Sequence, residues 1–286
     1  MDVAVIGAGR VGTALAVLLW RAGHRIVGVT GGDDTAGRAA RYLPGVPVEP
    51  AEVVAARADL VLLATPDDEI AAVCAFLAGE GGFRGGQFVG HVSGATGLDA
   101  LTPARAAGAG ILSFHPLQTF PDVDSAIERV PGSGLAVTAE DDAGYELGER
   151  LARDIGATPF RLHDQLKPLY HAAAVFASNY VVTVLAQADR LFRAAGVEDL
   201  SLWMPLSRSA VDALETLGPD QALTGPAVRG DAGTVRANLQ ALHRHAPEAV
   251  RTYAALATAA LDLAERSGRL SSPVRRAVEE VLAGWR

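Results

Sequence analysis

Four polar residues suited to proton transfer lie on an otherwise apolar stretch of the chain. Lys167 and His171 are four residues apart, Ser178 follows seven residues later, and Asn179 is next to it. At about 3.6 residues per turn, the first three fall on one face of a helix and Asn179 flanks that face. The spacing predicts a catalytic group built on Lys167 and His171. The alternative is a polar stripe on a buried helix.

Lys167 is also unusual in the composition. Of the 25 residues that are Lys or Arg, it is the single lysine. An amine can lose its proton near neutral pH when its surroundings lower its pKa, whereas a guanidinium cannot. Asp164 suits the N-cap of this helix and Pro168 its first turn, where the helix dipole lowers the pKa of a cation. Lys167 therefore marks a position where arginine would not serve, unless it is there by chance.

Three more polar residues are candidates for substrate binding. Ser93 and His115 come at the ends of two expected strands, where an open α/β sheet binds its ligands. Either residue can hydrogen-bond to a carboxylate or carbonyl, or can simply cap its loop. Arg229 lies in the turn-rich segment 224–231 and is expected to bind an acidic substrate, or to close a helix connection through Asp231.

A glycine motif indicates a cofactor. The segment Gly7–Gly12 matches G-x-G-x-x-G between an expected strand and an expected helix. In that context the glycines permit a tight turn, close approach of a pyrophosphate and close helix packing, and the helix N-terminus offers free N–H groups. The residues expected to bind a dinucleotide are Gly7, Ala8, Gly9, Arg10, Val11, Gly12, Thr30, Thr65 and Pro66.

The choice between NADP and NAD depends on the end of the second strand. Enzymes selective for NAD usually have Asp or Glu there to hold the ribose 2′-hydroxyl. Here the residue is Thr30, while Arg10, Arg38 and Arg41 are near enough in sequence to hold a 2′-phosphate. The sequence predicts NADP, and the acidic pair at 33–34 keeps NAD as the alternative.

The apolar pattern divides the chain into two domains. Alternating strands and helices over residues 1–163 predict a doubly wound, mostly parallel Rossmann sheet that binds NAD(P). Residues 164–286 read as Ala-rich helices, which we expect to form an all-α domain for substrate binding and dimerisation. The strands are expected at 2–6, 25–30, 59–65, 87–93, 110–114, 134–137 and 158–161. The helices are expected at 10–22, 35–42, 67–78, 141–155, 165–195, 202–217, 234–245, 247–267 and 273–282.

The composition limits the cellular location that we expect and the classes of partner that the protein can bind. A net charge of −8 argues against binding to nucleic acid or to an anionic membrane. Cys74 is the single cysteine, and a strand from Asp2 leaves no room for a signal peptide, so a cytoplasmic protein is expected. The uncharged stretch 172–188 contains Ser, Asn, Thr and Gln, which favours a helix buried in protein over a membrane span. The histidines show no metal-binding spacing, so no metal is expected.

Apolar surface predicts the oligomeric state. The Ala-rich helical patterns at 172–195 and 253–264 hold more apolar surface than a small domain needs to cover itself. We therefore expect a homodimer formed largely by the C-terminal helices.

Several motifs together resemble a known family. They are Gly7–Gly12 and the segments 91–94, 113–117, 167–174, 177–180 and 223–226. They resemble a bacterial family with a Rossmann-like N-terminal domain and a helical C-terminal domain of unassigned function. More distantly, the two-domain plan is similar to the 6-phosphogluconate dehydrogenase superfamily, which includes ketopantoate and pyrroline-5-carboxylate reductases. Several members have an asparagine one turn after the lysine, whereas His171 stands there in this chain.

This resemblance implies an NAD(P)-dependent oxidoreductase. We expect an NADP(H)-dependent reductase of a small carboxylate-bearing keto acid, with ketopantoate as the specific candidate. Lys167 would donate the proton or polarise the carbonyl, and His171 would hold or reprotonate it. Ser93 and Asn179 would orient the substrate, and the residues expected to bind it are His115, Ser178 and Arg229. The alternatives are an imine reductase of the pyrroline-5-carboxylate type and a non-catalytic NADP-binding sensor.

Overall fold

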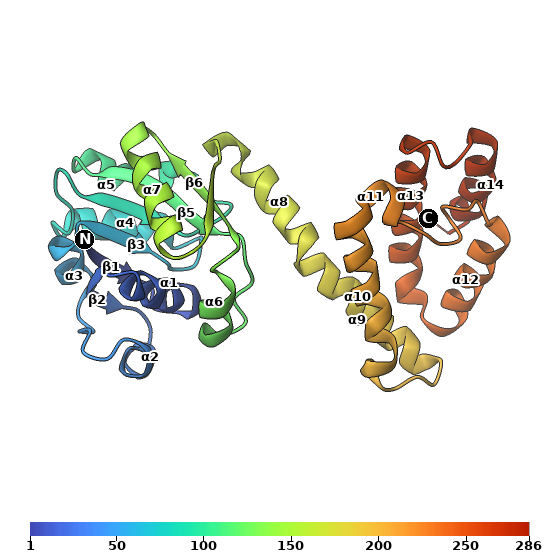
Figure 1. The fold of residues 1–286 in the computed structure, drawn as a ribbon, viewed down its shortest axis with the longest axis horizontal. Coiled ribbons are helices and arrows are strands. Elements are labelled where there is room, and N and C mark those ends of the chain that lie inside the picture. Colours follow the sequence, from blue (N-terminus) through green and yellow to red (C-terminus); the bar gives the residue numbers. More distant parts are fainter. Residues whose placement is uncertain (286) are drawn as a thin grey trace. The chain divides into compact units, whose positions relative to one another are not determined.

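A seven-stranded sheet of order β2-β1-β3-β4-β5-β6-β7 forms the N-terminal part of the protein in a computed structural model, which describes residues 1–285 (Figure 1). Neighbouring strands are parallel, except that β5 and β6 are antiparallel. This confirms the predicted, mostly parallel Rossmann-like sheet. The strands are β1 (Asp2–Ile6), β2 (Arg25–Thr30), β3 (Leu60–Leu63), β4 (Phe88–His91), β5 (Gly110–Pro116), β6 (Gly134–Ala139) and β7 (Thr158–Arg161).

Helices cover both faces of this sheet and create two separate cores. Side chains alternate along a strand, so Val3 and Val5 of β1 enter one core while Ala4 and Ile6 enter the other. The first core is closed by α1 (Arg10–Arg21), α2 (Thr35–Tyr42), α6 (Val123–Arg129) and α7 (Asp142–Asp154). The second is closed by α3 (Ala51–Arg57), α4 (Ile70–Gly79), a 3-10 turn at Leu98–Leu101 and α5 (Thr102–Ala106). Burial on both faces explains why these strands are apolar throughout.

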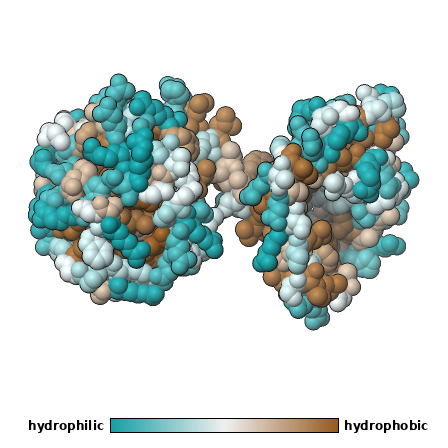
Figure 2. Space-filling model, in the orientation of Figure 1, coloured by the Kyte–Doolittle hydropathy of each residue, from teal (hydrophilic) through white to brown (hydrophobic). Residues whose placement is uncertain are grey.

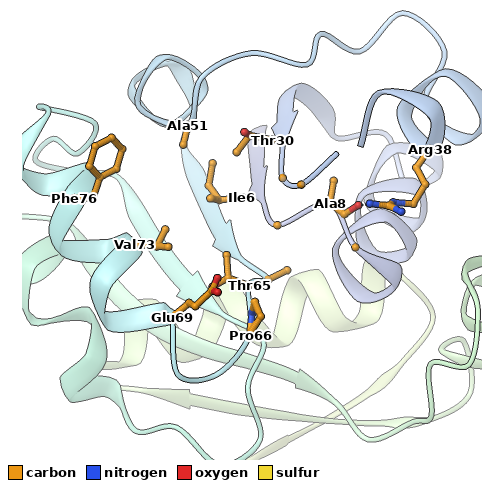
Figure 3. A pocket seen from close by; sticks show the side chains of 15 residues that line it. Ile6, Ala8, Thr30, Arg38, Ala51, Thr65, Pro66, Glu69, Val73 and Phe76 are labelled. Atoms are coloured by element: carbon orange, nitrogen blue, oxygen red, sulfur yellow. The ribbon is translucent and has the colours of Figure 1, made fainter. Parts of the chain in front are cut away.

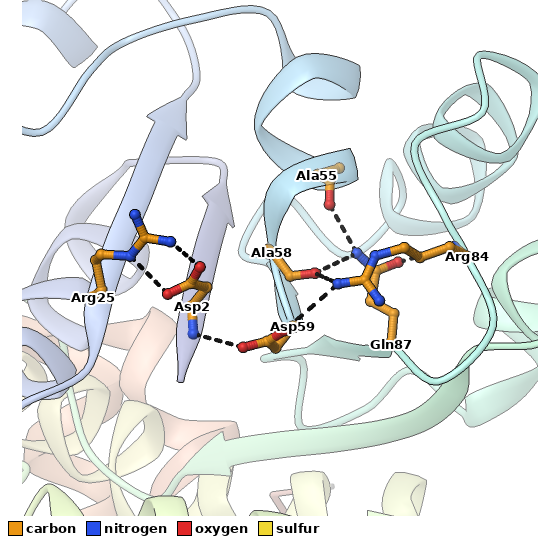
Figure 4. A network of polar contacts seen from close by, with 7 residues as sticks. All are labelled: Asp2, Arg25, Ala55, Ala58, Asp59, Arg84 and Gln87. Carbon is orange, nitrogen blue, oxygen red and sulfur yellow. Dashed lines mark hydrogen bonds and ion pairs between the residues drawn. The ribbon is translucent and has the colours of Figure 1, made fainter.

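A buried amide fixes the amino ends of β3 and β4 (Figure 4). The side chain of Gln87, which is fully buried, donates from Nε2 to the carbonyl oxygens of Ala55 at 2.8 Å and Ala58 at 2.9 Å. Arg84 donates to the same Ala58 oxygen and forms an ion pair with Asp59. Because a buried amide is stable only when it is hydrogen-bonded, these contacts hold the connection between α3 and β3 in place. The carboxyl ends of the strands, at the opposite edge, remain available for ligands.

Helices make up the rest of the chain. After α8 (Lys167–Ala177), they are α9 (Asn179–Ala194), α10 (Leu200–Leu217), α11 (Pro219–Ala222), α12 (Ala232–His245), α13 (Val250–Arg266) and α14 (Ser272–Ala283). The core of this part is formed mainly by α12, α13 and α14, through residues such as Val235, Leu239, Leu261 and Val278. In contrast, α9 contains no buried residue and α10 only Trp203.

The chain divides into two compact units, Met1–Asn179 and Tyr180–Arg286, later than the boundary expected after residue 163. The difference arises because α8 is bonded to the first unit through its N-terminal residues. The expected single helix over 165–195 is divided at Ser178, whose backbone angles of −127° and −73° end α8 before α9 begins.

The apolar stretch around this break contains no buried residue from 172 to 194 within the described part of the chain. Asp164–Ala194 is long and apolar enough to cross a membrane by length and composition, and none of its apolar window is buried. The described residues of this chain do not bury the helix over 172–188, so its expected burial in protein stays a prediction, which a homodimer through 172–195 would fulfil. The second unit builds its core mainly from α12 to α14, and α9 packs against it through the partly buried Leu191.

Candidate functional site

An open pocket of about 400 Å³ lies at the carboxyl ends of β1, β2 and β3 (Figure 3). In Figure 3, Arg38 of α2 and Phe76 of α4 stand on opposite sides of it. The expected cofactor residues that line it are Gly7, Ala8, Gly9, Thr30, Thr65 and Pro66. The buried hydroxyl of Thr65 has no hydrogen-bond partner among residues 1–285, so a ligand in the pocket can supply one.

The three motif glycines have different structural tasks. Gly7 has a φ of +98°, and a Cβ atom there would lie 2.6 Å from the backbone of Ala64. A Cβ on Gly12 would lie 2.3 Å from the carbonyl oxygen of Gly7, so these two positions require glycine for packing. A Cβ on Gly9 would meet nothing within 4 Å, and no side chain caps the N-terminus of α1 beside it. The loop therefore leaves open space and free N–H groups where a dinucleotide pyrophosphate fits.

The arginines near the pocket are directed to different places. Arg38 lines the pocket, where its Nε donates to the carbonyl oxygen of Ala8 at 2.8 Å and its guanidinium pairs with Asp34. Arg10 instead donates to a backbone carbonyl at residue 121, and Arg41 pairs with Asp124. Of the three arginines that the sequence offered for a 2′-phosphate, Arg38 lines the pocket. Val11 and Gly12 belong to α1 and do not line the pocket.

A second polar group, the lysine cluster, lies at the carboxyl ends of β4 and β5, on the same edge of the sheet. Lys167 is fully buried, and its Nζ donates to the carbonyl oxygen of Ser93 at 3.0 Å and to Ser113 Oγ at 2.7 Å. Burial lowers the pKa of Lys167 to about 8, against the opposing charges of Asp164 and Asp67. The amine is thus held inside the protein, between the two strand ends.

The imidazole rings of His115 and His171 both lie against Gly94, beside the lysine cluster. A Cβ atom on Gly94 would lie 2.8 Å from His115 Nε2 and 3.0 Å from His171 Nδ1. The other ring nitrogen of His115, Nδ1, is 2.9 Å from the hydroxyl of Tyr170. His171 Nδ1 is buried and has no hydrogen-bond partner in the described part of the chain. Burial, and then the charges of Lys167 and His171, lower the pKa of His115 to about 4, so this ring is neutral at pH 7.

The hydroxyl of Ser93 is occupied within its own loop. Its Oγ donates to Asp67 at 2.6 Å and accepts from the backbone nitrogens of Ala95 and Thr96. These are the loop-capping contacts that the sequence offered as one role of Ser93, and its role toward a substrate stays a prediction. Asp164 departs from its expected role: it accepts a hydrogen bond from the backbone of Leu98 at 2.9 Å, and no side chain caps α8.

The remaining predicted residues lie elsewhere. Ser178 is at the break between α8 and α9, and Asn179 is the first residue of α9. Arg229 is exposed and belongs to the second unit, next to Asp231, which caps α12. The structure therefore brings Lys167, His171, His115 and Ser93 together in the first unit and adds Ser113, Tyr170 and Gly94, which sequence reasoning did not assign to the site. Within residues 1–285, no group of three His, Cys, Asp or Glu side chains could hold a metal ion.

Comparison with known proteins gives matches to two domain families and to solved structures. No curated protein matches the sequence. BF3122 from Bacteroides fragilis, provisionally named an NADP oxidoreductase, is 22% identical with a TM-score of 0.76, over 91% of this chain and 98% of that one. Protein TM1727 from Thermotoga maritima is 20% identical with a TM-score of 0.67, over 92% and 98% of the two chains. An imine reductase from Myxococcus stipitatus in complex with NADP+ is 17% identical with a TM-score of 0.64, over 100% and 99%.

These identities show a shared fold. The family matches are more specific, because residues 1–116 match the Rossmann-like domain and residues 133–260 match the domain of unknown function DUF2520. These two matches confirm the predicted resemblance to a family with a Rossmann-like N-terminal domain and a C-terminal domain of unassigned function. The chain therefore joins a Rossmann-like domain to a C-terminal domain of the DUF2520 family.

Proposed function

We propose that the protein is an NADP(H)-dependent reductase of a small molecule with a polar double bond. One observation carries this proposal: a pocket that fits a dinucleotide and a group of buried titratable side chains lie at the same edge of one sheet. NADPH supplies a hydride when it is bound. Reduction also requires a proton, and the lysine cluster with its two neighbouring histidines holds the groups that can deliver it. The cytoplasm is the proposed location.

The charge of the cluster favours a carbonyl substrate. Lys167 brings a positive charge, and its nearest acidic neighbours, Asp67 and Asp164, are already hydrogen-bonded to Ser93 and to the backbone of Leu98. Such a site stabilises negative charge that develops on oxygen when a ketone is reduced. It also attracts a substrate carboxylate. We therefore propose a small keto acid, with ketopantoate as the first compound to test.

An imine is the second candidate, because the chain shares its fold with the imine reductase from M. stipitatus. A protonated imine is a cation, however, and the charge of Lys167 would repel it. Assays of NADPH oxidation with ketopantoate and with 1-pyrroline-5-carboxylate separate the two substrate classes. Turnover of the imine alone would contradict the carbonyl proposal. Tight NADPH binding without turnover of any keto acid or imine would favour a non-catalytic sensor.

Arg38 is expected to determine the preference for NADPH. It is the arginine that lines the pocket beside the end of β2, where Thr30 offers no carboxylate for a ribose 2′-hydroxyl. We expect NADPH to bind more tightly than NADH, and Arg38→Ala to weaken NADPH binding about tenfold, or about 1.4 kcal/mol, with little effect on NADH. Calorimetric titration measures both. Arg41→Ala is the matched control, since Arg41 pairs with Asp124 outside the pocket. Equal losses for both cofactors would contradict this role.

Exposed apolar side chains of the second unit are expected to form a homodimer. Val182 of α9 and Leu202 and Leu206 of α10 are 67%, 70% and 69% exposed, and Figure 2 shows apolar surface on this unit. Burial of such residues stabilises association. Light scattering should give twice the chain mass of 29.6 kDa, and the double variant Leu202→Glu, Leu206→Glu should be monomeric. Val53→Glu, at an exposed position of α3, is the control. A monomeric wild type at micromolar concentration would contradict the dimer.

A further inference from the structure

We infer that His115 Nε2 and His171 Nδ1 together bind the substrate oxygen, that His171 gives this oxygen its proton, and that Tyr170 and Lys167 are positioning residues. The inference rests on the proposed function and specifies its proton donor. It moves that role from Lys167, the first candidate in the sequence, to a histidine.

The positions of the two imidazoles support a shared ligand. Both nitrogens lie within 3.0 Å of the point where a Cβ atom of Gly94 would stand, so they are less than about 6 Å apart, and a single oxygen beside Gly94 can accept from both. Any side chain at residue 94 would collide with the two rings, which explains glycine there. His171 Nδ1 is a buried polar atom that lacks a partner among residues 1–285, and a ligand oxygen would satisfy it.

Tyr170 sets the hydrogen-bonding direction of His115. Burial raises the pKa of Tyr170 to about 12, so its hydroxyl keeps its proton and can donate to His115 Nδ1 at 2.9 Å. A neutral imidazole that accepts at Nδ1 carries its hydrogen on Nε2. His115 then carries its N–H on the ring nitrogen that faces Gly94 and lies beside His171. A neutral imidazole in this tautomer polarises a carbonyl without transferring a proton.

The two histidines therefore have different tasks. As the carbonyl carbon accepts the hydride, its π electron pair moves to oxygen, and that oxygen takes a proton from His171 Nδ1. His171 becomes neutral, and its buried Nδ1 regains a proton from water that enters when the product leaves. The groups that face His115 are Lys167, Tyr170 and His171 from α8 and His91 from β4. Among residues 1–285, no carboxylate contributes to the pKa of His115, so burial and the neighbouring positive charges keep that ring neutral.

Lys167 acts through its neighbours. Its side chain is fully buried, and its Nζ donates to the carbonyl oxygen of Ser93, just after β4, and to Ser113 Oγ on β5. These bonds fix the loop that carries Gly94. Its positive charge also lowers the pKa of His115. Both effects keep the imidazole pair in place and His115 uncharged, without contact between the amine and the substrate.

Nitrogen-15 NMR of the histidine rings tests this arrangement without turnover. At pH 7, His115 should be neutral with its hydrogen on Nε2, and Tyr170→Phe should mix its tautomers. In protein saturated with NADP+, the keto-acid analogue oxamate should shift His115 Nε2 and His171 Nδ1, while the exposed His245 stays unchanged. A hydrogen on His115 Nδ1 in the wild type, or no oxamate shift at either ring, would overturn the inference.

Kinetics with ketopantoate tests the proton donor. His171→Asn keeps a polar atom near Nδ1 but cannot carry the proton, so kcat should fall about a hundredfold or more, with a small change in KM. The fall of kcat toward high pH, which reports the loss of the acid, should disappear. His245→Asn is the matched control. Unchanged kcat in His171→Asn would overturn the inference, whereas inert wild type with a normal oxamate shift would overturn the proposed function alone.

Discussion

Gly9→Ala is expected to weaken NADPH binding by about ten- to a hundredfold, or roughly 1.4–2.7 kcal/mol, and to leave the fold intact. Gly9 has a φ of −77°, which alanine adopts without strain, and a Cβ there would meet no atom within 4 Å. The added methyl group would occupy the space through which a pyrophosphate approaches the loop and the N-terminus of α1. The loss should therefore appear in ligand affinity and not in stability.

Two further glycines make this experiment specific. Gly7→Ala should instead destabilise the protein, since φ is +98° and the new atom would lie 2.6 Å from backbone atoms of Ala64. Gly79→Ala, in α4 with open space around it, should change neither property. Calorimetric titration and thermal unfolding of the three variants give both quantities. Wild-type NADPH affinity in Gly9→Ala would mean that this loop does not hold the pyrophosphate, and the proposed function would lose its cofactor site.

The sequence predicted the long elements well, because each has a strong periodic pattern. Every strand of the sheet was expected within a few residues, and so were α1, α7, α12 and α14. The short helices α3, α5, α6 and α11 were missed, since four to seven residues hold too few turns for a clear period. One local signal was present for α6: Asp122 caps it by accepting from the backbone nitrogen of Ser125.

Strand direction and burial were harder to predict because they depend on distant parts of the chain. The antiparallel pairing of β5 with β6 is not encoded in either strand alone. The same limit applies to residues 172–188, among which the structure contains no buried residue. An apolar pattern predicts that a face is covered, but it does not identify what covers it.

The candidate site was predicted only in part, because some of its contacts also join distant parts of the chain. Helical spacing was enough to group Lys167 with His171 on α8. Ser113 belongs to the same cluster because β4 and β5 pair in a register that sets it opposite His91, a contact that sequence spacing does not reveal. Gly94 and Tyr170 lay inside segments that were noted for their resemblance. Their roles depend on the distances to His115, which only the fold supplies.

Lys167→Met is expected to remove a pH dependence of stability that the wild type shows between about pH 8 and pH 10.5. The pKa of Lys167 is about 8 in the folded protein, against 10.5 for an ordinary lysine, and burial is the largest cause. Across this interval the unfolded chain holds a proton that the folded protein has released. Stability therefore rises with pH by about 3 kcal/mol in the wild type. The contribution is present above pH 10.5 and is lost as pH falls through 8.

Denaturant unfolding of the wild type and of Lys167→Met at a series of pH values measures this difference in the pH dependence of stability. Because Lys167 is the single lysine of the chain, no other lysine titrates in the interval, and the tyrosines contribute equally to both proteins. Methionine has a similar length and no charge, so it avoids both a large cavity and a buried cation. In the same variant, the pKa of His115 should rise above its wild-type value of about 4, since the charge of Lys167 helps to lower it. Parallel stability curves for the two proteins, with an unchanged His115 pKa, would mean that the amine is hydrated and does not act on the imidazole pair.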